Sequence, residues 1–280
     1  MSEYVEPDPF ENDIEPVYSD EYEDDAENQI LALIKENHVV TDRELKVRLE
    51  SSFFPWLTER SLLKLVVKGE VKKYLLPGRK PKMGTPNTFY ADPDYDRYDR
   101  EALMRRKRDL TRDINAILTR QSPAGEHAEI LFEKAFRSIG CKILKKNASE
   151  FNGIKVQGIE GKQPPNLDFI LKKSNKIYGV DIKNWLQYEF VTIREVVKKV
   201  DIAEQLGIIP IIIARYVDRD TIYTKIIAKG GRCYPYQQLL IPPSYISLAD
   251  ELNRYMGYKV LAVDELPSYK IEHIKTKIII

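Results

Sequence analysis

The sequence contains little cysteine and little histidine. Its 280 residues include two cysteines, Cys141 and Cys233, and three histidines. None of them stands at the spacing of a zinc site, and two cysteines do not make a disulfide framework. A structural zinc is therefore not expected. Any metal would have to be held by carboxylate oxygens, a ligand set that suits Mg²⁺ or Mn²⁺.

Long apolar runs are also missing. Stretches such as residues 208–214 are far shorter than the roughly 20 residues needed to cross a bilayer. The N-terminus is acidic, whereas a signal peptide begins with basic residues followed by an apolar run. We therefore expect no membrane association and an intracellular, cytoplasmic location.

The first part of the chain lacks positive charge altogether. Residues 1–27 hold five Asp and seven Glu but no Lys or Arg, so the other 253 residues carry 44 basic and 31 acidic side chains, a net charge of +13. Residues 1–26 have too few bulky aliphatic residues to form a core, and we expect an acidic, disordered tail there. The basic remainder favours nucleic acid as a partner.

Residues 27–92 have the pattern of a small helical unit that ends in a hairpin. Ile30 and Ile34 belong to a first helical stripe. Thr41 and Glu44 form a capping-box pattern before a second helix. A third helix is expected from Thr58 to Gly69, followed by a strand, a basic loop rich in Gly and Pro, and a returning strand.

This order resembles a winged helix-turn-helix domain, in which the third helix enters the DNA major groove and the wing touches the backbone. The resemblance implies DNA-binding roles for basic residues of the third helix and of the wing: Arg60, Lys64, Lys68, Arg79, Lys80 and Lys82. A winged helix used only for protein contacts is the alternative.

Residues 93–121 are charged and periodic and predict one long linker helix. Residues 122–280 then predict an α/β domain with a mixed sheet flanked by helices. Within it, helices are expected at 126–139, 192–206 and 248–256, and strands at 141–144, 166–171, 177–183, 208–214, 259–263 and 275–280.

The two strands at 166–171 and 177–183 should form a hairpin around a polar turn. Side chains alternate between the faces of a strand, so Asp181 and Lys183 share one face, opposite Val180 and Ile182. A turn centred near residues 174 and 175 places Asp168 opposite Asp181. Two adjacent carboxylates repel unless a cation lies between them, so this cluster predicts a divalent metal beside a lysine.

The residues Asn-Leu-Asp-Phe-Ile-Leu and Gly-Val-Asp-Ile-Lys-Asn-Trp around Asp168 and Asp181 resemble the PD-(D/E)XK nuclease superfamily, which includes restriction endonucleases and Holliday-junction resolvases. The α-β-β-β-α-β core of that superfamily is matched by the element order expected over residues 126–214. In this family the proline before the first acid is usual, but Leu167 stands there, and the middle acid is more commonly Glu.

The resemblance implies that Asp168 and Asp181 bind Mg²⁺ or Mn²⁺ and that Lys183 positions the nucleophile. The family also places an acidic residue on the first helix, and the Gly-x-x-x-Glu pattern favours Glu129, with Glu126 and Glu133 as rivals. A further polar residue often follows the lysine, and Gln187 occupies that position.

The resulting expectation is a metal-dependent DNA endonuclease with a restriction-endonuclease-like α/β core, targeted by a winged-helix domain. A non-catalytic DNA-binding or regulatory protein on a nuclease scaffold stays open. So does a nuclease subunit of a recombination, transposition or defence complex that depends on protein partners. One site per chain makes a homodimer attractive for cutting both strands.

Overall fold

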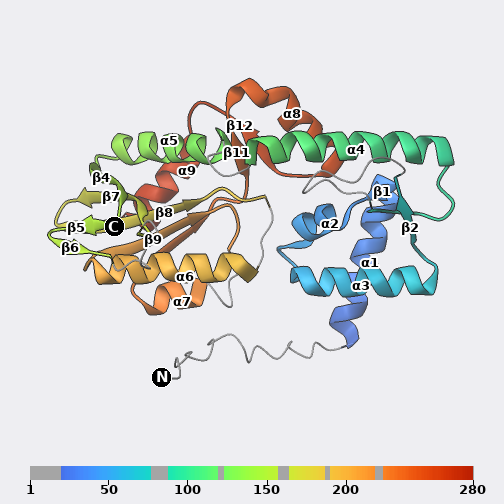
Figure 1. The fold of residues 1–280 in the computed structure, drawn as a ribbon, viewed down its shortest axis with the longest axis horizontal. Coiled ribbons are helices and arrows are strands. Elements are labelled where there is room, and N and C mark those ends of the chain that lie inside the picture. The colour runs from blue at the N-terminus through green and yellow to red at the C-terminus, as the bar shows by residue number, and fades with distance from the viewer. Residues whose placement is uncertain are drawn as a thin grey trace, which may run out of the picture.

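The structure is a computed structural model that describes residues 20–76, 88–118, 123–156, 164–186, 190–217 and 223–279. Two units lie side by side along its long axis (Figure 1). The N-terminal unit is made of residues 20–91, and the α/β unit begins at residue 123. The long helix α4 (Arg97–Leu118) runs along the top of the N-terminal unit toward α5 (Pro123–Ser138).

The N-terminal unit combines three helices with a small antiparallel sheet. Its strands are ordered β1-β3-β2. The elements are α1 (Asp20–Asn37), β1 (Val39–Val40), α2 (Asp42–Leu49), α3 (Pro55–Lys68), β2 (Lys72–Leu75) and β3 (Thr88–Ala91). Apart from the short β1, which the sequence pattern did not predict, the helices and strands follow the expected order.

Local sequence explains where these helices start and stop. Thr41 caps α2 by accepting a hydrogen bond from the Glu44 backbone, and the Glu44 side chain returns to the Thr41 N–H, as the capping-box pattern predicted. Pro55 occupies the first turn of α3, and Gly69 ends it in the left-handed conformation (φ 78°). The core between the helices is closed by apolar residues that include Ile30, Leu45 and Leu62.

The predicted disordered tail, residues 1–26, extends too far along the chain. Helix α1 begins at Asp20, so residues 20–26 are helical rather than disordered. Ala26 is fully buried and Tyr22 packs against the core of the N-terminal unit. The apolar contacts of these two residues, together with the ion pairs that Glu23 and Glu27 make with basic side chains of α3, provide the stabilisation that the acidic composition did not predict. Residues 1–19 lie outside the described part.

The α/β unit is built on a five-stranded mixed sheet with the order β10-β9-β8-β7-β4. Strands β4, β7 and β8 are antiparallel, whereas β8, β9 and β10 run parallel. The strands are β4 (Lys142–Ala148), β7 (Leu167–Lys173), β8 (Lys176–Lys183), β9 (Ile209–Ala214) and β10 (Arg232–Pro235), with a small hairpin of β5 (Glu150–Phe151) and β6 (Ile154–Lys155). The fold is thus mixed α/β, as expected.

Helices cover both faces of this sheet (Figure 1). On one face, α5 packs Phe132 and Phe136 against Phe169, Val180 and Ile211 of the strands. On the other face lie α6 (Phe190–Gln205) and α7 (Thr224–Ala228). Residues of α6 such as Val200 and Ala203 contact the strands there. The predicted hairpin is therefore sandwiched between α5 and α6.

The C-terminal segment departs from the sequence-based prediction. A strand was expected at 275–280, but α9 (Ser268–His273) continues into the π-helical segment η4 (Ile274–Ile278). Lys270, Ile274 and Ile278 are buried, whereas Glu272 and Thr276 between them are exposed, so burial recurs every four residues as in a helix and not every two as in a strand. Packing against the sheet therefore overrode the strand that the sequence predicted.

The remaining elements form a small subdomain over α4. Two parallel strands pair with each other, and the helix expected at 248–256 begins earlier, at Ile246. The elements are β11 (Leu239–Ile241), the 3-10 helix η2 (Pro243–Tyr245), α8 (Ile246–Glu251), the π-helical segment η3 (Leu252–Met256) and β12 (Val260–Ala262). No helix within the described residues is long and apolar enough to cross a membrane.

Buried ion pairs attach the N-terminal unit to α4 and to the α/β unit. Lys107 of α4 donates to the Glu44 carboxylate of α2 at 2.7 Å, and both side chains are almost completely buried. Arg215, just after β9, pairs with both oxygens of Glu50 at the end of α2. The guanidinium of Arg215 also donates to the Trp185 carbonyl at 2.6 Å. Helix α2 is therefore held against the α/β unit close to the end of β8.

Candidate active site and nucleic-acid interface

The hairpin of β7 and β8 brings two aspartates together. Phe169 pairs with Val180 and Ile170 with Gly179, which is the register expected from the polar turn. One step further, past the last backbone pair, the same register sets Asp168 opposite Asp181. Val180 and Ile182 pack in the core on the α5 side, so Asp181 points to the α6 side, as the alternation predicted.

Asp181 lies at the centre of the candidate site. Its side chain is fully buried, with 0% of its surface exposed, and two ammonium groups contact it. Lys183 donates to Oδ1 at 3.3 Å, and Lys199 of α6 lies 3.0 Å from the same oxygen. A buried carboxylate needs such compensation, because burying an unpaired charge is very costly.

Asp168 is anchored by the backbone of the opposite strand. Its Oδ2 accepts a hydrogen bond from the Ile182 N–H at 2.6 Å. Burial, followed by the repulsion of Asp181, raises the pKa of Asp168 to about 7, although Lys183 and the Ile182 amide act in the opposite direction. The Asp168 carboxyl group therefore titrates near neutral pH in the metal-free protein.

Lys183 is a cation in this site. Burial by itself lowers the pKa of the Lys183 ammonium, but the carboxylates of Asp181 and Asp168 outweigh burial, and the net pKa is raised. Its Nζ also lies 5.6 Å from the centre of the Trp185 ring. A protonated lysine donates hydrogen bonds, so it suits the positioning of a nucleophile or the neutralisation of phosphate charge rather than the removal of a proton.

The glutamates of α5 differ in their electrostatic surroundings. Burial and then the charge of Asp181 raise the pKa of Glu129, while Lys183 acts against them, so the charge of Glu129 interacts with that of Asp181. Glu126 is exposed. Glu133 is engaged by Arg137 at 2.8 Å and by Lys146 at 2.5 Å, which lower its pKa. Among these three glutamates, Glu129 is thus the one whose pKa is shifted by the charge of Asp181.

The donor chemistry of the cluster fits a divalent cation. Asp181 Oδ2 is buried and accepts no hydrogen bond from the described residues, although the Lys183 Nζ lies 3.0 Å away outside hydrogen-bond geometry. Three carboxylates that repel one another supply the oxygen ligands that Mg²⁺ and Mn²⁺ prefer. Within the described ranges, no three Asp, Glu, His or Cys side chains converge on one point. In the structure the carboxylates are engaged by lysines and a backbone amide.

Two polar residues of α6 belong to this neighbourhood and were missed by the sequence reasoning. Lys199 contacts Asp181 directly, and the carboxylate of Glu195 helps to raise the pKa of Lys183. The only signal in the sequence was their spacing of four on a helix beside the buried positions Val196 and Val200. Gln187 lies outside the described residues.

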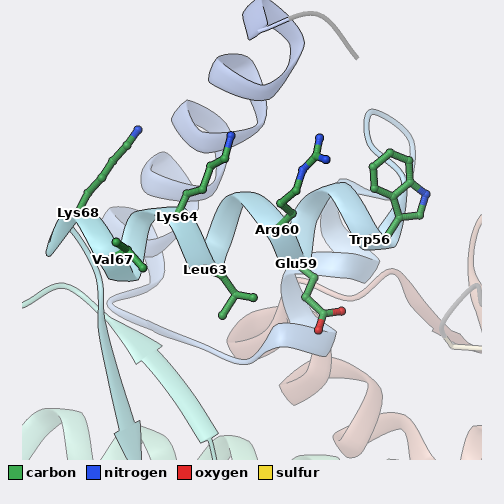
Figure 2. A pocket seen from close by; sticks show the side chains of 7 residues that line it. All are labelled: Trp56, Glu59, Arg60, Leu63, Lys64, Val67 and Lys68. Atoms are coloured by element: carbon green, nitrogen blue, oxygen red, sulfur yellow. The ribbon is translucent and has the colours of Figure 1, made fainter. Parts of the chain in front are cut away.

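The predicted DNA-binding residues of α3 form one row. Figure 2 shows Arg60, Lys64 and Lys68 leaving α3 on the same side, whereas Glu59 and Leu63 leave it on the other. Together with Trp56 and Val67 they line an open groove. Leu63 and Val67 are exposed apolar side chains, with 48% and 88% of their surface accessible. The wing residues Arg79, Lys80 and Lys82 lie outside the described residues.

The cations of α3 are paired with carboxylates of α1. Glu23 binds both Arg60 and Lys64, and Glu27 binds Lys68. The basic side chains stay accessible, whereas Glu23 and Glu27 are largely covered. Each predicted phosphate-binding side chain of α3 is thus ion-paired with a carboxylate of the same chain.

The comparisons with known proteins add no family to these observations. No family model, no curated protein and no solved structure matches this chain.

Proposed function

We propose that this protein is a metal-dependent DNA endonuclease. The observation that carries the proposal is the meeting of Asp168, Asp181 and Lys183 at the end of one hairpin, with Glu129 coupled to them from α5. A fully buried carboxylate beside a second carboxylate is a costly arrangement for a structural element. Perturbed, coupled acids of this kind are typical of active sites.

The order of elements supports the same class. From α5 to β9, and apart from the separate β5–β6 hairpin, the chain runs helix, three antiparallel strands, helix and parallel strand, which is the α-β-β-β-α-β order of the PD-(D/E)XK nucleases that the motif resembles. We propose a restriction-endonuclease-like core on this basis. The site lies between the two helical layers, where a rigid sheet holds the acids in place.

Asp168, Asp181 and Glu129 would hold Mg²⁺ or Mn²⁺ in this proposal. When bound, the metal supplies a Lewis acid and an activated water for phosphodiester hydrolysis. Lys183, as an ammonium, orients the nucleophile and offsets charge on the phosphate in the transition state. The hydrogen bond from the Ile182 amide holds the Asp168 carboxylate in place throughout the reaction.

The N-terminal unit would serve as a winged helix that docks the enzyme on DNA. The cations Arg60, Lys64 and Lys68 lie on one side of α3, and basic side chains in this arrangement contact phosphates. The ion pairs of Glu50 with Arg215 and of Glu44 with Lys107 hold this unit in a set position relative to the hairpin. Docking and cutting would therefore occur at a fixed separation on the same duplex.

Cleavage assays on four substrates test the proposal: supercoiled, linear, single-stranded and branched DNA, each with Mg²⁺, Mn²⁺ or EDTA. We expect nicking or cutting with either metal and none with EDTA. Asp181→Asn and Lys183→Met should each reduce the rate by about 1,000-fold or more, whereas Lys275→Met, an exposed lysine on η4, should leave it unchanged.

Two results would contradict the proposal. One is cleavage that persists in both site variants, because the hairpin would then not carry the chemistry. The other is salt-sensitive DNA binding without metal-dependent turnover on any substrate, which would favour a DNA-binding protein on a nuclease scaffold. Cutting that appears only with a second protein would assign the chain to a larger complex. The ratio of nicked to linear product reports whether one chain or a homodimer acts.

A further inference from the structure

A second lysine enters the site from the helical layer below the sheet. Lys199 of α6 places its Nζ 3.0 Å from Asp181 Oδ1, and only 16% of its side chain is exposed. The same ammonium donates to the backbone carbonyl of Asn166, the residue that precedes β7. Lys199 therefore connects α6 with both strands that carry the aspartates.

The two oxygens of Asp181 have different surroundings. Oδ1 receives both ammonium groups, from Lys183 at 3.3 Å and from Lys199 at 3.0 Å. Oδ2 is buried and accepts no hydrogen bond from the described residues, although the Lys183 Nζ lies 3.0 Å from it. Lys199 thus contacts Oδ1 alone, and Oδ2 is the oxygen that a cation would reach if the Lys183 ammonium moved away from it.

We propose that Lys199 is a positioning residue that fixes the Asp181 carboxylate for metal binding and, through its charge, limits the affinity of the site for the metal. The proposal rests on the proposed function. Lys183 alone cannot do both tasks, since an ammonium bound to Asp181 is not free to meet the nucleophile or the phosphate. Lys199 keeps a positive charge beside Asp181 when the Lys183 ammonium leaves that carboxylate for the nucleophile or the phosphate.

The two effects of Lys199 have opposite signs, which makes them separable. A positive charge close to the metal repels it, so removal of the ammonium strengthens metal binding. The loss of a group that orients a ligand lowers turnover, typically by 10-fold to 100-fold for partners of metal ligands. A residue that merely stabilised the fold would not tighten metal binding.

The test compares Lys199→Met, Lys199→Arg and wild type. Lys198→Met is the matched control, because Lys198 is the exposed neighbour on the same helix. Mn²⁺ binding to the metal-free protein is measured by calorimetry without DNA, and kcat and KM are measured on a cleaved substrate. For Lys199→Met we expect the Kd for Mn²⁺ to fall about tenfold and kcat to fall about 30-fold with KM for DNA unchanged.

The conservative variant supplies the second comparison. Lys199→Arg keeps the positive charge and the donor, so its Kd for Mn²⁺ should stay within about twofold of wild type and its kcat should recover in part. If Lys199→Met fails to fold, Lys199→Gln, which keeps an amide donor but no charge, replaces it with the same expected tightening. Lys198→Met should behave as wild type.

The outcomes distinguish this inference from the proposed function. Unchanged Mn²⁺ affinity or unchanged kcat in folded Lys199→Met overturns the role of Lys199, even when wild type cuts DNA. Tightened Mn²⁺ binding in a protein that cuts no DNA supports the role of Lys199 and contradicts the nuclease proposal. Absence of Mn²⁺ binding in wild type overturns the inference as well.

Discussion

The Asp168 carboxylate accepts a hydrogen bond from the backbone N–H of Ile182 at 2.6 Å. The backbone pairing of β7 and β8 ends at Phe169 and Val180, and past that pair this side-chain bond holds the two strand ends together. The residues on either side of Ile182 are Asp181 and Lys183, so a single bond sets the distance between the three groups of the candidate site.

The titration of Asp168 gives the metal-free protein a pH-dependent stability. Its pKa is raised from 3.8 to about 7 in the folded chain. The protonated form is therefore favoured by folding, and this contribution is complete below pH 3.8 and is lost as the pH rises through about 7. In EDTA, we expect wild type to lose about 2 kcal/mol relative to Asp168→Asn between pH 5 and pH 7, because the slope of about 1.4 kcal/mol per pH unit halves as the pH reaches the folded pKa.

Urea denaturation of both proteins at several pH values measures this difference. Asn cannot titrate, so the groups that do not interact with Asp168 cancel in the comparison. A constant difference across the range would show that Asp168 keeps an ordinary pKa in the folded protein, and that the Asp168–Asp181 repulsion is already relieved.

The glutamates of α5 should differ in their effect on cleavage. Glu129 is electrostatically coupled to Asp181, and Glu126 is an exposed residue three positions earlier. We expect Glu129→Gln to lower kcat by about 10-fold to 100-fold, and Glu126→Gln to change it by less than about twofold. Equal losses in the two variants would mean that the electrostatic interaction of Glu129 with Asp181 does not distinguish it from Glu126 in the reaction.

The carboxylates of α1 should weaken DNA binding by α3. Glu23 and Glu27 occupy the cations of Arg60, Lys64 and Lys68, and phosphates must displace them. The double variant Glu23→Gln with Glu27→Gln should bind DNA several-fold more tightly at low salt and show a steeper salt dependence, by up to about 0.9 in logarithmic slope for each cation freed.

Asp20→Asn with Glu21→Gln is the matched control, since both residues are exposed on α1 and make the same change in net charge. Fluorescence anisotropy with a labelled duplex measures both variants. Equal gains in the two double variants would attribute the effect to net charge alone and not to the ion pairs with α3.

The ion pair between Glu50 and Arg215 should be a large contributor to stability. Its side chains are only 11% and 6% exposed, so removal of the carboxylate leaves a buried guanidinium without its charge partner. We expect Glu50→Gln to lower the free energy of unfolding by about 3 kcal/mol. Glu101→Gln, which breaks exposed ion pairs of α4 with Arg97 and Arg105, should cost less than about 0.5 kcal/mol.

The same variant probes the connection between the two units. Arg215 also donates to the Trp185 carbonyl, two residues after Lys183. Glu50→Gln should therefore lower the cleavage rate even at a temperature where it is fully folded. A variant that is destabilised but keeps the full rate would show that the position of the N-terminal unit does not affect the hairpin.

The sequence by itself determined the parts of the site that depend on local periodicity. The alternation along β8 assigned Asp181 and Lys183 to one face, and the polar turn set the register that brings Asp168 opposite Asp181. The capping pattern at Thr41 and the glycine after α3 likewise placed helix ends correctly. Each of these features is encoded within a few residues of where it acts.

Only the tertiary structure decided which distant groups join that hairpin. Lys199 reaches Asp181 because α6 packs on the face to which Asp181 points, and Glu129 is separated from Glu126 by the way α5 lies on the opposite face. Likewise, packing made residues 268–278 helical and made Glu23 and Glu27 ion-pair partners of α3. Such contacts depend on how whole elements pack, and no short stretch of sequence carries that information.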